Sequence, residues 1–221
     1  MNVLVVAPHP DDEVLGCGGS IARHVANGDE VHVLVATRGM PELYSDEGVA
    51  HVREEAKRAH AKLGVTETHF RDFPAPALDT VPRYQLAEMI ASVIREQQVE
   101  CLYIPHHGDI HSDHFHLYHA ALVAARPLGH CPVRRILVYE TISETEWAPP
   151  LADSVFYPTV FVDISGYLPL KLDAMACFES QVQPPPSARS LRTIESLARY
   201  RGATVSCDAA EGFMLVREIV R

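Results

Sequence analysis

The sequence predicts an α/β domain of the Rossmann-like, doubly wound type with a mostly parallel sheet. Short apolar runs rich in β-branched residues alternate with amphipathic helical patterns through the first two thirds of the chain. The clearest helical pattern has apolar residues three and four positions apart and a glycine stop: Val49, Val52, Ala56, Ala59, Leu63, then Gly64. Strands separated by helices imply right-handed crossovers and a sheet covered on both faces. The 221 residues suit a single domain, 1–221, with an elaborated C-terminal third.

Each expected strand is a short apolar run bounded by turn or helix signals. In the first two thirds of the chain these runs lie at residues 3–7, 31–36, 68–73, 101–104 and 136–139. The helical patterns between them lie at about residues 13–27, 49–63, 86–94 and 114–125. In the common strand order of this fold class the first and fourth strands are neighbours. Ligands then bind beyond the carboxyl ends of those two strands.

The pattern loosens beyond about Glu140. The sequence TEWAPP, residues 145–150, predicts a loop. We expect a strand at 159–164, helices at 168–180 and 190–200 that the QPPPSA stretch separates, and a closing strand at 212–220. This segment forms the elaborated C-terminal third.

Composition and charge exclude several classes of protein. The formal charge of −10, from 29 acidic and 19 basic residues, should repel nucleic acid and anionic membranes. No run approaches the length of a transmembrane helix, and no basic residues precede the first apolar run as they would in a signal peptide. The five scattered cysteines form no CxxC pair, which indicates reduced thiols and a cytoplasmic location.

Two polar stretches follow the first and fourth expected strands. The first is His9-Pro10-Asp11-Asp12-Glu13, directly after a buried apolar run. The second is PHHGDIHSDHFH at residues 105–116, and six of the thirteen histidines lie between residues 106 and 119. Because the fold brings the ends of these two strands side by side, the two stretches predict a functional site.

Simpler explanations account for only part of the first stretch. Gly16, Gly18 and Gly19 resemble a dinucleotide fingerprint, but they lie inside the expected helix, and the acids at its start would repel a pyrophosphate. Close packing of helix against sheet explains these glycines better. Helix capping explains one of the acids, but it explains neither His9 nor the second histidine cluster.

A metal site explains both stretches. Imidazole and carboxylate ligands together suit zinc or a similar divalent ion, and a catalytic zinc site uses three protein ligands plus water. His9 and Asp12 supply two ligands. The second stretch must supply the third, from His111 or His114, which are three residues apart.

The two motifs resemble the signature of the PIG-L/LmbE-like deacetylases. The first motif is Ala7-Pro8-His9-Pro10-Asp11-Asp12-Glu13, and the second is His111-Ser112-Asp113-His114. Weaker similarities span nearly the whole chain: Thr37-Arg38-Gly39, Arg53-Glu54-Glu55, Leu63-Gly64, Tyr139-Glu140-Thr141, Val162-Asp163-Ile164, Lys171, Ser180-Gln181, Arg189-Ser190 and Ala210-Glu211-Gly212-Phe213. One departure is Ser187-Ala188, where the family pattern has His-Pro before the arginine.

The resemblance implies hydrolysis of an N-acetyl group on an N-acetylglucosamine-type sugar, with one zinc ion per chain. By matching position, it makes His9, Asp12 and His114 the metal ligands and Asp11 the general base. An acetamide is a poor electrophile, so the chemistry needs a Lewis acid and a base of this kind.

The resemblance also assigns residues to proton donation and substrate binding. It makes His111 the acid or the group that stabilises the oxyanion, and Asp113 the residue that holds His111 in its working orientation. The pairing with Asp113 is also expected to keep His111 charged. Arg53 matches a position at the rim of the site, where two roles are open: binding of substrate hydroxyls or a phosphate, or an Arg–Glu pair on the helix surface. It is the one basic residue that the sequence alone places near the site.

Two other functions remain open from the sequence. A metal-dependent phosphoesterase would favour a second metal, for which Glu13 and Asp109 are candidate ligands. A non-catalytic sugar-binding module is less favoured, because the chain keeps Asp11 and His111. The sequence does not specify the acetylated substrate, the native metal or the oligomeric state, for which a homo-oligomer is one option. It also leaves open the roles of five residues: His106, His107, His116, His119 and Trp147.

Overall fold

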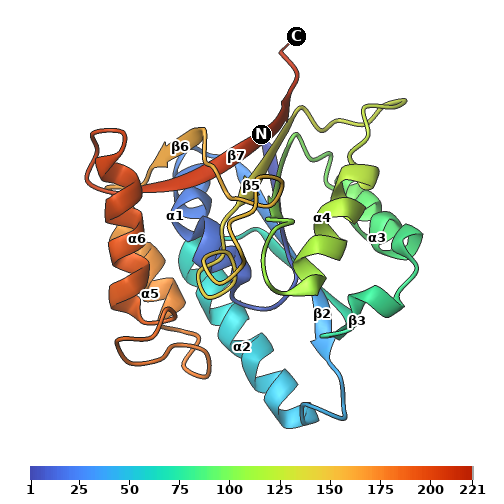
Figure 1. Cartoon of the computed structure of the whole chain (residues 1–221). Coiled ribbons are helices and arrows are strands. Elements are labelled where there is room, and N and C mark those ends of the chain that lie inside the picture. Colours follow the sequence, from blue (N-terminus) through green and yellow to red (C-terminus); the bar gives the residue numbers. More distant parts are fainter. Residues whose placement is uncertain (221) are drawn as a thin grey trace.

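Seven strands form one mostly parallel sheet in the computed structural model, which describes residues 1–220 (Figure 1). The strands are β1 (Asn2–Ala7), β2 (Glu30–Gly39), β3 (Glu67–Ala75), β4 (Cys101–Pro105), β5 (Arg135–Tyr139), β6 (Val160–Asp163) and β7 (Ala210–Glu218). Their order is β3-β2-β1-β4-β5-β7-β6, and β7 alone runs opposite to the other six strands. The predicted fold class, a mostly parallel α/β sheet, is therefore confirmed.

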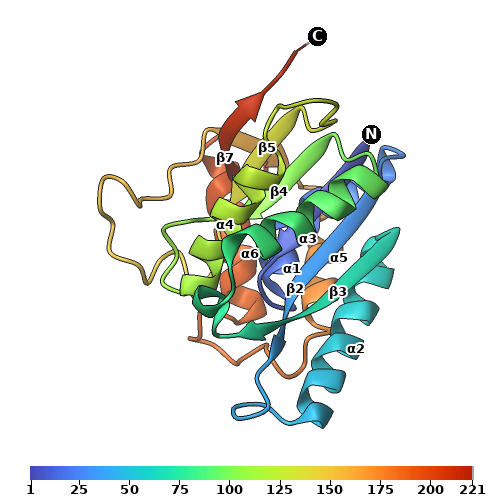
Figure 2. The same cartoon turned by 90° about the vertical axis from the view of Figure 1, so that its right-hand side faces the viewer.

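Helices cover both faces of the sheet. They are α1 (Asp12–Ala26), α2 (Asp46–Leu63), α3 (Arg83–Glu96), α4 (Ser112–Ala124), α5 (Leu168–Met175) and α6 (Leu191–Ala203), with a 3-10 turn η1 (Leu78–Thr80). Alternate residues of β1 point to opposite faces. Val3 and Val5 join the core under α1, α2, α5 and α6, whereas Leu4 and Val6 join the core under α3 and α4 (Figure 2). No helix in the described part of the chain is long and apolar enough to cross a membrane.

The pairing of β1 with β4 positions the two polar stretches. Val3 pairs with Cys101 and Val5 with Tyr103 in parallel register, so the two strands end at the same edge of the sheet. The turn from β1 into α1 and the start of α4 therefore lie side by side, as the strand order predicts.

The C-terminal third differs from prediction in one helix. Helix α5 ends at Met175, although the sequence predicts a helix to residue 180. The chain turns away because Ser180 is held by α2: its backbone N–H and its hydroxyl both donate to the carboxylate of Glu55, the former at 2.8 Å. Glu55 is fully buried, so these two hydrogen bonds help to satisfy its carboxylate in the core, together with His51, whose Nε2 lies 3.2 Å from Oε1.

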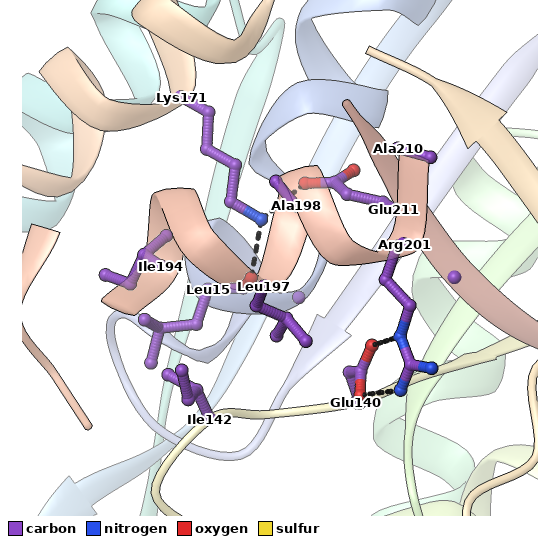
Figure 3. Close-up of a pocket in the computed structure, with 12 residues that line it drawn as sticks. Leu15, Glu140, Ile142, Lys171, Ile194, Leu197, Ala198, Arg201, Ala210 and Glu211 are labelled. Atoms are coloured by element: carbon purple, nitrogen blue, oxygen red, sulfur yellow. Dashed lines mark hydrogen bonds and ion pairs between the residues drawn. The ribbon is translucent and has the colours of Figure 1, made fainter. Parts of the chain in front are cut away.

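Buried polar contacts tie α1 to the C-terminal third. Lys171 Nζ of α5 donates to the Leu15 carbonyl oxygen at 2.7 Å and to Glu211 Oε1 of β7 at 2.6 Å (Figure 3). The same carboxylate accepts the N–H groups of Gly19 and Ser20 at 2.9 and 2.7 Å. Because both charges are buried and paired, losing either partner would leave the other uncompensated. Helix α1 is thereby fixed against β7 and α5.

The glycines of α1 allow close packing, as predicted. A Cβ atom at Gly16 would lie 2.3 Å from Cδ2 of Tyr139, and one at Gly19 would lie 2.6 Å from Cδ1 of Ile164. Tyr139 is fully buried, and its hydroxyl donates to the Val6 carbonyl oxygen at 2.9 Å, so its ring has no free space to move into. The glycines thus set the distance of α1 from the sheet.

Gly16→Ala should therefore destabilise the fold by about 1–3 kcal/mol, the usual cost of overpacking a core. Denaturant unfolding followed by circular dichroism measures this change. Gly48→Ala is the matched control, because Gly48 is an exposed helical glycine whose added Cβ meets only Ser45 Oγ at 3.2 Å. The control should be neutral or stabilising through helix propensity. Equal stability of wild type and Gly16→Ala would contradict the packing argument.

Candidate active site

The two predicted polar stretches meet at a cleft of about 420 Å³ at the carboxyl edge of the sheet. His9 and Asp11 line the cleft from the turn between β1 and α1, and His111 lines it from the start of α4. Arg53 of α2 and Arg189, directly before α6, complete its walls. Asp12 and His114 lie buried beside it.

His9, Asp12 and His114 come together as a candidate metal site. One donor atom from each lies within 4.8 Å of the other two. Asp12 Oδ2 is 3.2 Å from His9 Nδ1 and 3.4 Å from His114 Nε2. Asp12 Oδ1 and His114 Nε2 are buried and have no hydrogen-bond partner, which is costly unless a ligand uses them.

The surroundings of His114 favour metal binding. Its Nδ1 lies 2.8 Å from Asp109 Oδ2, and Asp109 Oδ1 accepts a hydrogen bond from Thr145 Oγ1 at 2.6 Å. A carboxylate on one ring nitrogen fixes the other as the ligand atom, as is usual in metal sites. Two imidazoles and one carboxylate suit zinc and similar divalent ions. The residues present therefore fit such an ion.

The charges of the three residues in this cluster strongly affect one another's pKa values. Burial disfavours the imidazolium of His114, but Asp12 and Asp109 outweigh it and raise the pKa to about 10. Burial likewise opposes the charge on His9, but Asp113 and Asp12 raise its pKa to about 9. Burial also disfavours the Asp12 carboxylate, yet the two imidazoles hold its pKa well below the usual range. A cation would thus replace protons at these imidazoles.

Asp11 faces the cleft beside this cluster and does not cap its helix. It is the N-cap residue of α1 in the left-handed region, with φ of 115°, and its side chain makes no capping hydrogen bond. Its Oδ2 instead accepts a hydrogen bond from Arg189 Nη1 at 2.7 Å. Burial raises the pKa of Asp11 to about 8 even though Arg189 opposes the shift. The capping explanation therefore does not account for Asp11.

His111 presents one ring nitrogen to the cleft. Its Nδ1 accepts the backbone N–H of Asp113 at 3.2 Å, so in the neutral ring the proton is on Nε2. Burial and the neighbouring charge of His9 lower its pKa to about 4. A neutral His111 can donate one hydrogen bond from Nε2 into the cleft.

The Asp113 carboxylate contacts His9 in this structure, whereas the resemblance implied a pair with His111. Asp113 Oδ2 lies 3.1 Å from His9 Nε2, and Oδ1 accepts the N–H of Leu78 at 3.0 Å. Asp113 is therefore one of the two carboxylates that raise the pKa of His9. The negative charge of Asp113 still favours a charged His111, but burial and the charge of His9 outweigh it, so the role of Asp113 toward His111 stays a prediction.

Arg53 lies on the cleft wall where the resemblance expected it. Its Nη2 donates to the Arg71 carbonyl oxygen at 2.6 Å and to Asp72 Oδ1 at 2.8 Å, and its guanidinium lies 5.2 Å from the centre of the Phe70 ring. Asp72 is 70% exposed, so water screens this ion pair. A ligand anion or hydroxyl could therefore replace Asp72.

Arg189 is a site residue that the sequence did not assign, so Arg53 is not the only basic residue near the site. Besides Asp11, Arg189 donates from Nε to Ser143 Oγ at 2.8 Å and from Nη1 to Gln181 Oε1 at 3.2 Å. The one sequence signal for Arg189 was the similarity of the Arg189-Ser190 pair to the family pattern. In the structure Ser190 caps α6 by accepting the N–H of Thr193. Ser187 Oγ accepts the N–H of Arg189, so the departure from the family pattern takes part in this loop.

The other clustered histidines have structural contacts. Nε2 of His106 donates to the Ser154 carbonyl oxygen at 2.8 Å, and Nε2 of His107 to that of Asp153 at 2.9 Å. These bonds fix the loop after β5. His116 and His119 lie beside Phe115 on α4, and Trp147 is 60% exposed.

A His–Asp–His cluster beside a cleft at the carboxyl edge of a Rossmann-like sheet is the arrangement of a metal-dependent α/β enzyme. The model of the family PIG-L, GlcNAc-PI de-N-acetylase, matches residues 4–125, more than half of the chain. The chain is also 32% identical over 183 residues to the uncharacterized deacetylase YaiS of Escherichia coli, covering 79% of this chain and 88% of YaiS. The chain therefore belongs to the PIG-L family.

Other relatives agree with this assignment. Diacetylchitobiose deacetylase of Thermococcus kodakarensis is 28% identical over 230 residues, which cover 97% of this chain and 83% of that enzyme. The crystal structure of the conserved protein TT1542 of Thermus thermophilus matches with a TM-score of 0.81 at 27% identity, covering 99% of this chain and 96% of that one.

The same fold also occurs in an enzyme with a different reaction. GalB, a 4-carboxy-2-hydroxymuconate hydratase of Pseudomonas putida, matches with a TM-score of 0.77 at 23% identity, covering 100% of this chain and 98% of that one. The fold alone therefore does not determine the reaction.

Proposed function

We propose that the protein is a zinc-dependent hydrolase that removes the N-acetyl group from a small 2-acetamido sugar and releases acetate and an amine. The observation that carries this proposal is the cluster of His9, Asp12 and His114, in which Asp12 Oδ1 and His114 Nε2 are buried without partners, next to Asp11 in the cleft. Membership of the PIG-L family and the named substrate of the Thermococcus relative support the substrate class.

His9, Asp12 and His114 would hold the metal ion. When bound, a divalent ion supplies a Lewis acid that polarises an amide carbonyl and makes water more acidic. Asp11 would act as the general base, because its carboxylate borders the cleft and lies next to ligand Asp12 in the chain. Water that gives its proton to Asp11 attacks the acetamide carbon.

His111 and Arg189 would assist the same step. The Nε2–H of His111 would donate a hydrogen bond to the carbonyl oxygen as negative charge develops there, which favours the oxyanion-stabilising role over the acid role. Arg189 would orient Asp11 through their 2.7 Å ion pair. The nitrogen needs a proton to leave as an amine, and protonated Asp11 can return the one it took. Asp113 would position His9 and the turn that carries His111.

Contacts of the remaining acids weigh against a two-metal phosphoesterase. Glu13 Oε1 lies 2.8 Å from His60 Nε2, and its Oε2 accepts the N–H of Asp11. Asp109 is occupied by His114 and Thr145. Both carboxylates are therefore engaged, and a single catalytic ion fits better than a pair.

The free thiols support a reducing, cytoplasmic location. All five cysteines are unpaired, and Cys17, Cys101 and Cys177 are buried. Burial raises the pKa of the Cys101 thiol to about 12, which keeps it inert. We propose that the enzyme acts there on a soluble substrate.

Removal of metal tests the mechanism. Dialysis against a chelator should abolish release of amine from an acetamido sugar, and adding zinc should restore it. Elemental analysis of the same samples relates activity to metal content. Full activity in a sample shown to be free of metal would exclude the mechanism.

The neighbouring aspartates should separate metal binding from catalysis. Asp12→Asn should lower metal affinity, because it replaces a charged ligand with a neutral one. Asp11→Asn should keep the metal yet lose roughly 10²–10⁴-fold in kcat, the scale of a general base. Asparagine tolerates the left-handed backbone of Asp11, so its effect reports charge and not refolding. Metal content and initial rates are measured for each variant.

His114 and His111 allow the same separation of metal binding from catalysis. His114→Ala should release the catalytic metal, whereas His111→Ala should retain it and lower kcat. The opposite result, with metal lost from the His111 variant and kept by the His114 variant, would show that the two roles are exchanged.

The substrate class is tested with a panel of N-acetylated sugars. The zinc-loaded enzyme should free an amine from at least one of them and release no phosphate from phosphate esters. Arg53→Ala should raise KM more than it lowers kcat, because it removes binding common to the ground and transition states. Arg58→Ala, an exposed arginine on the same helix outside the cleft, is the control and should leave both constants unchanged.

Ready hydrolysis of phosphate esters without release of amine from any acetamido sugar would overturn the assignment. A kcat effect of Arg53→Ala larger than its KM effect would instead show that Arg53 acts in the chemical step.

A further inference from the structure

A second group of metal-binding side chains lies at the opposite end of the sheet from the cleft. His32 is near the start of β2, and Glu67 and His69 are at the start of β3. The two strands are parallel neighbours, with His32 opposite Glu67 and Leu34 opposite His69 (Figure 2). Because residues two apart on a strand share a face, the three side chains project from the same side of the sheet.

The geometry of this group is close to that of a ligand set. One donor atom from each side chain lies within 4.8 Å of the other two. The rings of His32 and His69 are stacked with their centres 5.8 Å apart and their planes at 25°. Glu67 Oε1 is 3.6 Å from His69 Nδ1.

The imidazoles are buried without partners. His32 is 2% exposed and His69 is 8% exposed. Both ring nitrogens of His32, and Nε2 of His69, have no hydrogen-bond partner. Buried polar atoms in folded proteins almost always have a partner, so three such nitrogens on two adjacent rings call for an explanation. A bound cation would supply it.

We propose that His32, Glu67 and His69 form a second metal site, which binds one divalent transition-metal ion and joins the edge strand β3 to β2. Two imidazoles and one carboxylate suit Zn²⁺ or a similar ion, and they do not suit Mg²⁺ or Ca²⁺, which prefer oxygen ligands. Burial lowers the pKa of both histidines, which leaves the neutral rings able to bind a metal. Gln97 donates to Glu67 Oε2 at 3.3 Å and helps to orient the carboxylate.

This site is separate from the catalytic cluster. Thr37, five residues along β2 from His32, donates to the carbonyl oxygen of Pro8 in the first motif. Five residues of extended strand span about 16 Å. Paired metals in phosphoesterases lie about 3.5–4 Å apart, so the second ion is not part of a two-metal centre. Its role is to hold the edge strand.

Metal stoichiometry tests the proposal. Purified full-length protein is loaded with excess zinc, dialysed against buffer with micromolar zinc, and analysed for metal and protein. Wild type should hold two zinc ions per chain, and His32→Phe should hold one. His130→Phe, which changes an exposed histidine outside the group, is the matched control and should still hold two.

The two sites should titrate independently. His114→Ala should also hold one ion, and the variant with both His32→Phe and His114→Ala should hold none. Zinc should raise the Tm of His114→Ala but not that of the double variant, because an ion that binds only folded protein stabilises it. Deacetylation by His32→Phe should remain at the wild-type level.

Two results would overturn the proposal. One is a wild-type content of a single zinc that His32→Phe does not change, which would make the pair a packed core contact. The other is two zinc ions that both persist in His32→Phe. If that variant does not fold, Glu67→Gln provides the same comparison, since it keeps the size of the side chain and should lower the affinity of the second site at least tenfold.

Discussion

The parallel pairing of β1 with β4 is the constraint on which the site depends. It places the carboxyl ends of two strands almost 100 residues apart in the chain at one edge of the sheet. The turn after β1 carries Asp12, and the helix after β4 carries His114, so their contact is a consequence of strand order. The glycines of α1 then set how closely α1 itself approaches β5. A change in either would move Asp12 relative to His114.

Buried charges restrain the side chains of the site. Asp12 and His114 lie in the interior, where an unpaired charge is strongly disfavoured and a paired one is expensive to separate. The pairs extend outward through Asp109 and Thr145, so each polar group restrains the next. The C-terminal third contributes in the same way, since Arg189 supplies the positive charge that pairs with the Asp11 carboxylate. The last third of the chain therefore contributes to a site whose two motifs lie between residues 7 and 114.

The sequence predicted most of the fold and the centre of the site, because both depend on local signals. Apolar runs and glycine stops marked the strands and helices, and strand order brought the two motifs together. It did not predict Arg189, since 178 residues separate that side chain from Asp11 and only the tertiary fold connects them. The early end of α5 was missed because its cause is a distant buried carboxylate, Glu55. No sequence signal marked a site at His32 and His69, for a similar reason. The two residues lie on different strands and come together only when β2 and β3 pair.

The different environments of Asp11 and Asp12 follow from one backbone conformation. Asp12 is the first residue of α1 and its carboxylate points inward, toward His9 and His114. Asp11 has a positive φ, which directs its carboxylate to the cleft and Arg189. A non-glycine residue in this region costs on the order of 1–3 kcal/mol, so the surrounding contacts must enforce it. The N–H of Asp11 is held by Glu13, and its carboxylate by Arg189, at either end of the residue. Strain at a single residue thus lets two adjacent carboxylates face the two imidazoles and the cleft at once.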